Sequence, residues 1–216
     1  ETVAIIGSTG SGKSTIINLI PRFFDVSCGK ITIDNVDIRD IKFHKLRSLL
    51  GFVPQTATLF TGTIRENITY GKQDVSDEEM KHAAKIAQAT EFIESSDKQY
   101  DSFVDQGGVN FSGGQKQRMS IARAIVRKPK VYIFDDTFSA LDFKTDAQLR
   151  KALKEETKHA TVIIVAQRIG TIMDADRIIV LQDGQIVASG KHKELLKSST
   201  VYQEIALSQL SEEELQ

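Results

Sequence analysis

The feature that most constrains the fold of this chain is a glycine-rich segment near its start, which reads Gly7-Ser8-Thr9-Gly10-Ser11-Gly12-Lys13-Ser14-Thr15. It fits the spacing G-x-x-x-x-G-K-[ST] of a phosphate-binding loop (P-loop). Apolar residues precede it at 2–6 and follow it at 16–20, which predicts a buried strand, the loop, and a helix through about Leu19. The sequence therefore predicts an α/β fold that binds nucleotide phosphates.

Each residue type in this loop suits a polyphosphate. Gly7, Gly10 and Gly12 let successive backbone N–H groups turn toward the anion, where a side chain would block the approach. Lys13 sets a positive charge against the terminal phosphates, the helix beginning there points its positive end at them, and Ser14 can ligate Mg²⁺. A plain Gly/Ser-rich turn is the alternative, and the apolar runs on both sides argue against it. We expect the phosphates to contact Ser8, Thr9, Gly10, Ser11, Gly12, Lys13, Ser14 and Thr15.

Composition narrows the class of protein. The 216 residues suit one large domain or one domain with an insertion. A net charge of −1 without a long basic run gives no footprint for nucleic acid, so no nucleic-acid partner is expected. The single cysteine, Cys28, excludes an internal disulfide and is expected to be a small packing residue. Without a signal peptide or a long apolar run, we expect a soluble, cytosolic chain, cut from a longer protein because Glu1 already lies in a strand.

Short apolar runs predict the core sheet. The runs at 131–134 and 161–165 are continuously hydrophobic, which is typical of strands buried on both faces of a parallel sheet. Further strands are predicted at 30–34 and 50–53, and the turn at 182–185 predicts a hairpin, after which a helix at 192–197 closes the domain. We therefore predict a P-loop NTPase core with a mostly parallel sheet and antiparallel β elements.

A long middle stretch lacks strand signals. From about Ile64 to Arg127 helical periodicity replaces them, most clearly at 77–89 and 115–126. The acidic tail from Ser208 is expected to fray. The predicted organisation is a P-loop core subdomain formed by 1–55 and 129–216, with 56–128 inserted as an α-helical subdomain.

A second glycine-containing motif precedes a long helix. Ser112-x-x-Gln115 has the form of a capping box, which predicts a helix start. The cap does not need two consecutive glycines, which weaken a helix but expose backbone N–H groups beside the Ser112 hydroxyl. This makes a second anion-binding surface, and one chain seldom needs two for one nucleotide. Its candidate residues are Ser112, Gly113, Gly114 and Gln115.

With this motif the chain resembles the ATP-binding cassette family, whose LSGGQ signature appears here as FSGGQ at 111–115. Gln55 matches the family's Q-loop, Asp135 ends the Walker B strand, and 139–142 match the D-loop, while 63–68 look like the exporter type. The resemblance implies ATP and Mg²⁺ as ligands, with Ser14, Gln55 and Asp135 holding the metal. It also implies that two such domains pair head to tail, each P-loop facing the partner's signature. A transmembrane domain of the same polypeptide would hold the domain at the cytoplasmic face of the membrane.

Two residues depart from the family pattern within one composite site. Asp136 stands where the family has the Glu that acts as general base, so the carboxylate is one methylene shorter. Gln167 replaces the switch histidine and cannot transfer a proton near neutral pH. We expect Asp136, Gln167 and Gln55 to form the catalytic group, with weak hydrolysis at the chain's own Walker site. These features look like one half of a heterodimeric bacterial multidrug exporter with a non-identical partner.

Several alternatives stay open from the sequence. An ATP-dependent dimerisation module, with hydrolysis confined to the partner's Walker site, is the second hypothesis, and a soluble relative acting on DNA or ribosomes is disfavoured by the near-neutral charge. Asp142 can cap the following helix, contact a partner, or do both. Leu59 and Phe60 can receive a membrane-domain helix or lie buried. The four histidines show no metal-ligand spacing and are expected at the surface.

Overall fold

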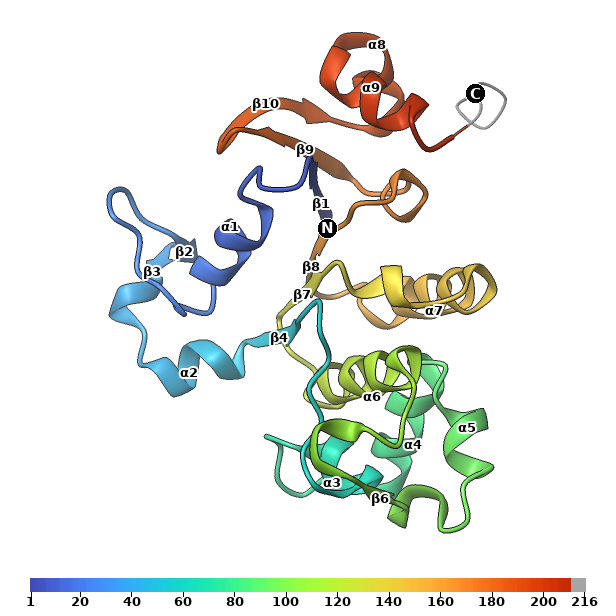
Figure 1. Cartoon of the computed structure of the whole chain (residues 1–216). Helices are drawn as coiled ribbons and strands as arrows, with labels where there is room; N and C mark the ends of the chain where they lie inside the picture. Colours follow the sequence, from blue (N-terminus) through green and yellow to red (C-terminus); the bar gives the residue numbers. More distant parts are fainter. Residues whose placement is uncertain (211–216) are drawn as a thin grey trace.

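The central sheet is built from the apolar runs of the sequence. In the computed structural model, which describes residues 1–210, six strands lie in the order β10-β9-β1-β8-β7-β4 (Figure 1). The strands from β9 to β4 are parallel to their neighbours, and β10 is antiparallel to β9. The predicted α/β fold with a mostly parallel core sheet and antiparallel elements is confirmed. The strands are β1 (Thr2–Gly7), β4 (Leu50–Val53), β7 (Val131–Asp135), β8 (Thr161–Val165), β9 (Arg177–Gln182) and β10 (Gln185–Gly190).

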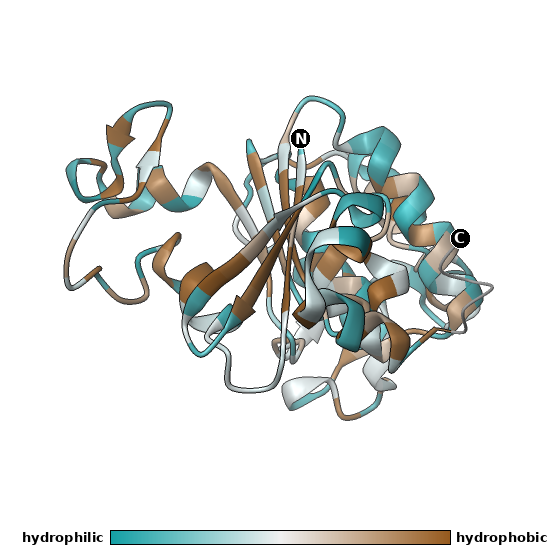
Figure 2. Cartoon of the chain, turned by 90° about the horizontal axis from the view of Figure 1, so that it is seen from above, coloured by the Kyte–Doolittle hydropathy of each residue, from teal (hydrophilic) through white to brown (hydrophobic). Residues whose placement is uncertain are grey.

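Side chains of the sheet alternate between two apolar layers. On one face, Ile5 and Ile133 pack with Ile17 of α1 (Lys13–Leu19), so the predicted helix after the P-loop is confirmed. On the opposite face, Ile6 and Phe134 belong to a larger core that other helices complete. Figure 2 shows the hydrophobic residues concentrated in the strands at the centre. Because both faces are covered, these strands need continuous rather than alternating apolar sequence.

Helices that follow β7 cover part of the larger core. α7 (Phe143–Glu156) begins at Asp142, whose Oδ1 accepts the N–H of Thr145 at 3.0 Å, so the predicted helix cap is confirmed. The C-terminal pair consists of α8 (His192–Ser198) and α9 (Thr200–Leu207), of which α9 was not predicted. Within the described residues 1–210, no helix combines the length and apolar character that crossing a membrane requires.

Between β4 and β7 the chain is mainly helical. Three of its helices begin with a capping box, at Thr63, Ser76 and Ser112, which satisfies backbone N–H groups that the first turn leaves free. Two strands of two residues each were missed, because so short a strand leaves no periodicity in the sequence. The elements are β5 (Gly62–Thr63), α3 (Ile64–Thr69), α4 (Asp77–Ile86), α5 (Thr90–Glu94), β6 (Phe103–Val104) and α6 (Gly113–Val126).

This helical region shares one apolar cluster with the sheet. Met80 of α4 and Met119 of α6 are fully buried in the same cluster as Phe134 of β7. The division into a core at 1–55 and 129–216 and a subdomain at 56–128 stays a prediction. A small hairpin, β2 (Thr32–Ile33) and β3 (Val36–Asp37), and α2 (Phe43–Ser48) complete the first half of the chain.

Three local expectations were wrong. Cys28 is exposed and not a packing residue. His192 is 6% exposed, because it lies at the start of α8 against Tyr202, with Nδ1 2.7 Å from the Tyr202 hydroxyl. The tail does not fray at Ser208, because the Gln209 side chain is hydrogen-bonded to residues 167 and 169. The rest of the predicted acidic tail, from 211 to 216, lies outside the described residues.

Candidate functional site

Four segments of the predicted site meet at one edge of the sheet. The strands β1, β4, β7 and β8 run in the same direction, so their carboxyl ends share this edge. The P-loop follows β1, Gln55 follows β4, Asp135 and Asp136 stand at the end of β7, and Gln167 follows β8. Ligands of open α/β sheets bind at this edge. The fold therefore brings the predicted P-loop and carboxylate residues to the edge where ligands of this class of fold bind.

The P-loop is folded around the Lys13 ammonium group. Its Nζ donates to the carbonyl oxygens of Gly7 and Ser8, each at 2.8 Å, and lies 3.4 Å from the Ser11 hydroxyl. Gly10 and Gly12 have φ of 82° and 97°, a conformation that side chains disfavour. The crest of the loop, Ser8 to Gly10, is exposed, as are Ser14 and Thr15. The loop thus presents an open backbone surface with a positive charge held beneath it.

Gly7 is required by packing. A Cβ atom at this position would lie 2.2 Å from the carbonyl oxygen of Leu181 and 2.7 Å from the Ser11 hydroxyl. Leu181 is the register partner of Gly7 on β9, so that oxygen is fixed by the sheet. The first glycine of the loop therefore serves the close approach of two strands, and Gly10 and Gly12 serve the turn.

Three charged groups crowd the centre of the site. Burial lowers the pKa of Lys13, and the charges of Asp136 and Asp135 act in the opposite direction. Burial also raises the pKa of Asp135, as does the charge of Asp136, while the Ser14 hydroxyl bond and Lys13 oppose this. Such opposing perturbations are common at functional sites. The centre of the site is therefore a place where burial and neighbouring charges act against each other on both Lys13 and Asp135.

The donor set suits a hard cation. The Ser14 hydroxyl lies 3.2 Å from Oδ1 of Asp135, and the Gln55 side chain reaches the neighbouring Asp136 through its Nε2, which leaves its carbonyl oxygen as the atom for a cation. Hydroxyl, carboxylate and amide oxygens are the ligands Mg²⁺ takes, together with water and substrate phosphate. No group of three or more His, Cys, Asp or Glu side chains able to hold a metal occurs among residues 1–210. The residues present therefore fit Mg²⁺ completed by substrate oxygens.

Asp136 is held by two amide groups. Gln55 Nε2 at 3.1 Å and Gln167 Nε2 at 2.9 Å both donate to the same carboxylate oxygen, Oδ2. The backbone of Asp136 is in the left-handed region with φ 43°, and its N–H donates to the Val165 carbonyl at 2.8 Å. The structure thus brings the three residues predicted as catalytic into one hydrogen-bonded group.

The second motif lies elsewhere in the molecule. Ser112 caps α6 as predicted, with Ser112 N–H to Gln115 Oε1 at 2.9 Å and Gln115 N–H to Ser112 Oγ at 3.3 Å. Within the described chain no hydrogen bond joins this motif to the P-loop group, and α1 and α6 pack on opposite faces of the sheet (Figure 1). A Cβ atom on Gly113 would meet nothing within 4 Å. This glycine is therefore not demanded by the packing of its own chain.

Sequence reasoning missed three side chains that support the site. Gln117, 2% exposed, donates to the Pro54 carbonyl at 3.0 Å, next to Gln55. Arg168 donates to the Ser139 carbonyl at 3.3 Å, and Gln209 bonds to the backbone of residues 167 and 169. These are contacts between distant segments, and no local pattern could have indicated them.

The two alternatives for Leu59 and Phe60 apply to one residue each. Leu59 is buried, whereas Phe60 is exposed and stacks on Tyr70.

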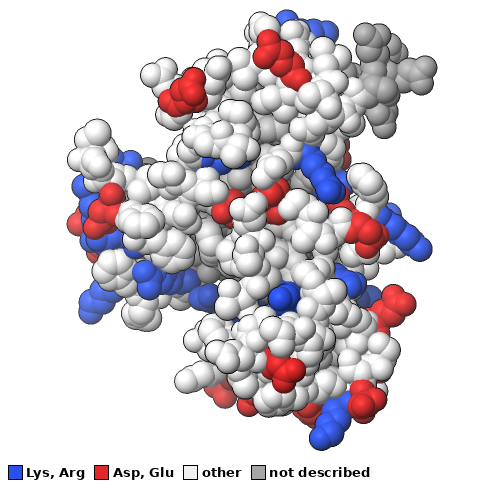
Figure 3. Space-filling model, viewed as in Figure 1, with Lys and Arg blue, Asp and Glu red and all other residues white. Residues whose placement is uncertain are grey.

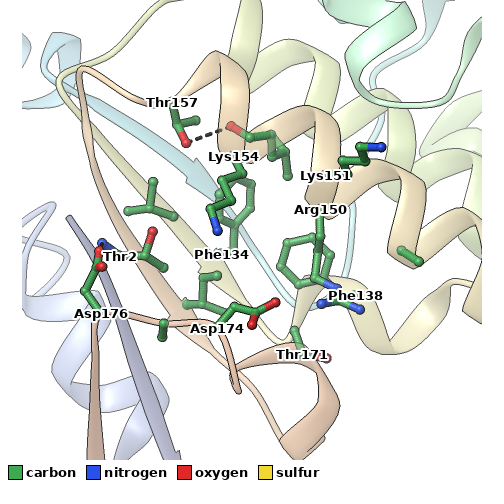
Figure 4. Close-up of a pocket in the computed structure, with 15 residues that line it drawn as sticks. Thr2, Phe134, Phe138, Arg150, Lys151, Lys154, Thr157, Thr171, Asp174 and Asp176 are labelled. Atoms are coloured by element: carbon green, nitrogen blue, oxygen red, sulfur yellow. Dashed lines mark hydrogen bonds between the residues drawn. The ribbon is translucent and has the colours of Figure 1, made fainter. Parts of the chain in front are cut away.

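A separate cavity has a different character. A volume of about 420 Å³ lies between α7 and the segment that precedes β9, with an apolar floor that includes Phe134 and Phe138 and with Arg150 and Lys154 at its rim (Figure 4). It contains none of the predicted site residues.

On the face shown in Figure 3, basic side chains form separate groups, several beside acidic ones. The face shown in Figure 3 therefore presents no continuous basic track.

Comparisons with known proteins agree with this geometry. The profile of the family described as ABC transporter matches residues 1–139. An uncharacterised ABC transporter ATP-binding protein of Bacillus subtilis is 48% identical over 99% of this chain and 37% of its own length. An ATP-dependent lipid A-core flippase of Desulfotalea psychrophila is 45% identical over 94% of this chain and 36% of its own length.

A solved structure is similar over the same region. A bacterial Atm1-family ABC exporter with ATP bound superimposes with a TM-score of 0.92 at 41% identity, over 94% of this chain and 36% of that one. The chain therefore spans little more than a third of the length of the relatives it matches.

Proposed function

The chain belongs to the ABC transporter family, and from that membership we propose that it is the ATP-binding and ATP-hydrolysing domain of an exporter. The observation that carries this proposal is the edge of the sheet where the P-loop, Asp135 and Asp136 meet, with Lys13 held beneath the loop and Ser14 beside Asp135. The relative described as a lipid A-core flippase and the solved exporter structure support the transport direction. A transmembrane domain of the same polypeptide would then hold the domain at the cytoplasmic face of the membrane.

The second half of the site would come from another copy of the domain. Ser112, Gly113, Gly114 and Gln115 form a capped helix start away from the chain's own P-loop, in which the cap uses the N–H groups of Ser112 and Gln115 and leaves those of Gly113 and Gly114 for a ligand. Because Gly113 is not required by internal packing, its lack of a side chain suits close approach by something outside the chain. A head-to-tail pair would place this surface against the partner's P-loop and the partner's equivalent surface against this one.

The residues divide the binding task between them. Backbone N–H groups from Ser8 to Thr15 would hold the phosphates, and the Lys13 ammonium would neutralise the terminal ones. Ser14, Asp135 and the Gln55 carbonyl would hold Mg²⁺, which supplies charge neutralisation and a template for the phosphate oxygens. Asp136 would accept the proton of the attacking water, and the Gln167 amide would orient the group without transferring a proton.

The chain's own Walker site should hydrolyse slowly. The Asp136 side chain is one methylene shorter than that of Glu, and its backbone N–H is bonded to the Val165 carbonyl at 2.8 Å, so the carboxylate stays close to the end of β7. A base misplaced by about 1 Å can lose about a hundredfold in rate. We therefore propose a non-identical partner whose Walker site carries the faster hydrolysis, completed by this chain's signature.

The alternative is an ATP-dependent dimerisation module that hydrolyses nothing at its own site, which the short side chain of Asp136 also supports. Single-turnover cleavage in the intact transporter, with the partner's own base disabled, separates the two. Slow but measurable cleavage favours the weak ATPase, and none with retained ATP binding favours the module. Fast cleavage at this chain's P-loop would remove both.

The binding function has its own control. Lys13→Ala should weaken Mg-ATP binding at least about tenfold, since a charge-assisted contact with the phosphates is lost. Lys130→Ala, at an exposed lysine that lies 3.4 Å from Asp34, should leave binding unchanged. Equal affinity of the two variants would refute the P-loop role.

A further inference from the structure

The side chain of Gln209 forms two hydrogen bonds to the segment 167–169, and we call this pair of bonds the bracket. Its Nε2 donates to the carbonyl oxygen of Gln167 at 2.7 Å, and its Oε1 accepts the N–H of Ile169 at 2.8 Å. A carbonyl oxygen only accepts and a backbone N–H only donates, so these two partners define the orientation of the amide. One side chain is thus hydrogen-bonded to both ends of the segment 167–169, from a position 42 residues after Gln167.

Gln209 extends from an anchored element. It follows α9, where Tyr202 and Ala206 are fully buried, and its own N–H donates to the Ala206 carbonyl at 3.0 Å. The Tyr202 hydroxyl lies 2.7 Å from Nδ1 of His192 on α8, which ties the two helices together. The position of residues 167–169 therefore depends on where the C-terminal helix pair lies.

The bracketed segment lies just beyond the support of the sheet. β8 ends at Val165, and the N–H of Ala166 donates to the Ile5 carbonyl at 3.2 Å. The Gln167 side chain then reaches out to Oδ2 of Asp136 at 2.9 Å. Because a side chain's rotamer depends on its backbone dihedrals, the direction of this amide depends on what holds the backbone of Gln167.

We propose that Gln209 is a positioning residue for Gln167 and, through it, for the Asp136 carboxylate. The C-terminal helix pair and the catalytic edge are thereby joined by a chain of hydrogen bonds that runs from Gln209 to Gln167 to Asp136. The effect on hydrolysis rests on the proposed function, whereas the bracket itself does not.

Two substitutions separate the two halves of the bracket. Gln209→Ala removes both bonds, and Gln209→Glu keeps an acceptor for the Ile169 N–H but loses the donor to Gln167. Gln203→Ala is the matched control, because Gln203 is a glutamine of α9 whose side chain donates to the Leu196 carbonyl.

The first measurement is amide hydrogen exchange of Ile169 in the full-length protein without nucleotide. Gln209→Ala should speed this exchange by about fivefold, the effect of losing one ordinary hydrogen bond. Gln209→Glu and Gln203→Ala should leave it unchanged. Unaltered exchange in Gln209→Ala would overturn the bracket, whether or not the protein hydrolyses ATP.

The second measurement is single-turnover ATP cleavage at this chain's P-loop. Both Gln209 variants should lower the rate about tenfold, as expected for a group displaced by less than 1 Å, and change ATP affinity less than about threefold. In a Gln167→Ala background, Gln209→Ala should lower the rate no further. An equal loss in both backgrounds, or the same loss in Gln203→Ala, would overturn positioning through Gln167. If the wild type binds no ATP, the proposed function fails while the exchange result still decides on the bracket.

Discussion

Lengthening Asp136 by one methylene tests what limits hydrolysis. In the wild type, both amide donors converge on Oδ2, at 3.1 Å from Gln55 and 2.9 Å from Gln167. The Asp136 backbone is fixed by its N–H bond to the Val165 carbonyl at 2.8 Å, so only side-chain length changes the reach of the carboxylate. One carbon–carbon bond adds about 1.5 Å. Since an error near 1 Å costs about a hundredfold, Asp136→Glu should recover up to about 2.7 kcal/mol of barrier.

The assay is single-turnover cleavage of Mg-ATP in the intact transporter, with the partner's own catalytic base disabled. Asp136→Gln is the matched control, because it has the length of Glu but cannot accept a proton from water. We expect Asp136→Glu to cleave up to about a hundredfold faster than the wild type and Asp136→Gln to cleave no faster. The reasoning is refuted if Glu gives no gain, or if Gln gives the same gain, because carboxylate reach would then not be the limit.

Three further predictions concern stability. Gly7→Ala should lower the free energy of unfolding by about 1–3 kcal/mol in a urea titration, because its Cβ would lie 2.2 Å from the Leu181 carbonyl, whereas Gly170→Ala, where nothing lies within 4 Å, should be near neutral. Ser112→Ala should cost about 1 kcal/mol in the same titration, because α6 loses its side-chain cap. Burial lowers the pKa of His192 below its usual 6.5, so the unfolded chain binds the proton first, and stability that is complete above pH 6.5 should fall as the pH drops below it. Thermal melts from pH 7.5 to 5.5 should show a smaller drop in Tm for His192→Asn, and an equal drop would contradict this reasoning.

The fold was predictable where one local pattern determines one element. Continuous apolar runs predicted the inner strands, and the glycine spacing predicted the loop and α1. The Ser112-x-x-Gln115 spacing predicted the start of α6. Each of these signals lies within a few residues of what it specifies.

The support of the site was not predictable, because it consists of contacts between distant segments. Gln209 looked like part of a polar tail, and its two hydrogen bonds exist only because α9, itself unpredicted, brings it beside residues 167–169. His192 looked like a surface residue until α9 covered it with Tyr202. The sequence showed that Asp136 is one methylene shorter than the family's Glu. It did not show that two amides donate to the same oxygen of Asp136, because this arrangement depends on the ends of β4, β7 and β8 lying side by side.

A series of contacts joins α6, the helix of the second motif, to the Asp136 carboxylate. Gln117 lies on α6, the helix that Ser112 caps, and it donates to the Pro54 carbonyl at 3.0 Å, one residue before Gln55. Gln55 in turn donates to Asp136 at 3.1 Å. Because Gln117 is 2% exposed, breaking its bond would leave a buried polar group, so α6 and residue 55 should move together. If the proposed partner domain displaces α6 at its amino end, the Gln55 bond to the carboxylate should therefore change, while the Gln167 bond, which Gln209 supports from the other side, stays in place.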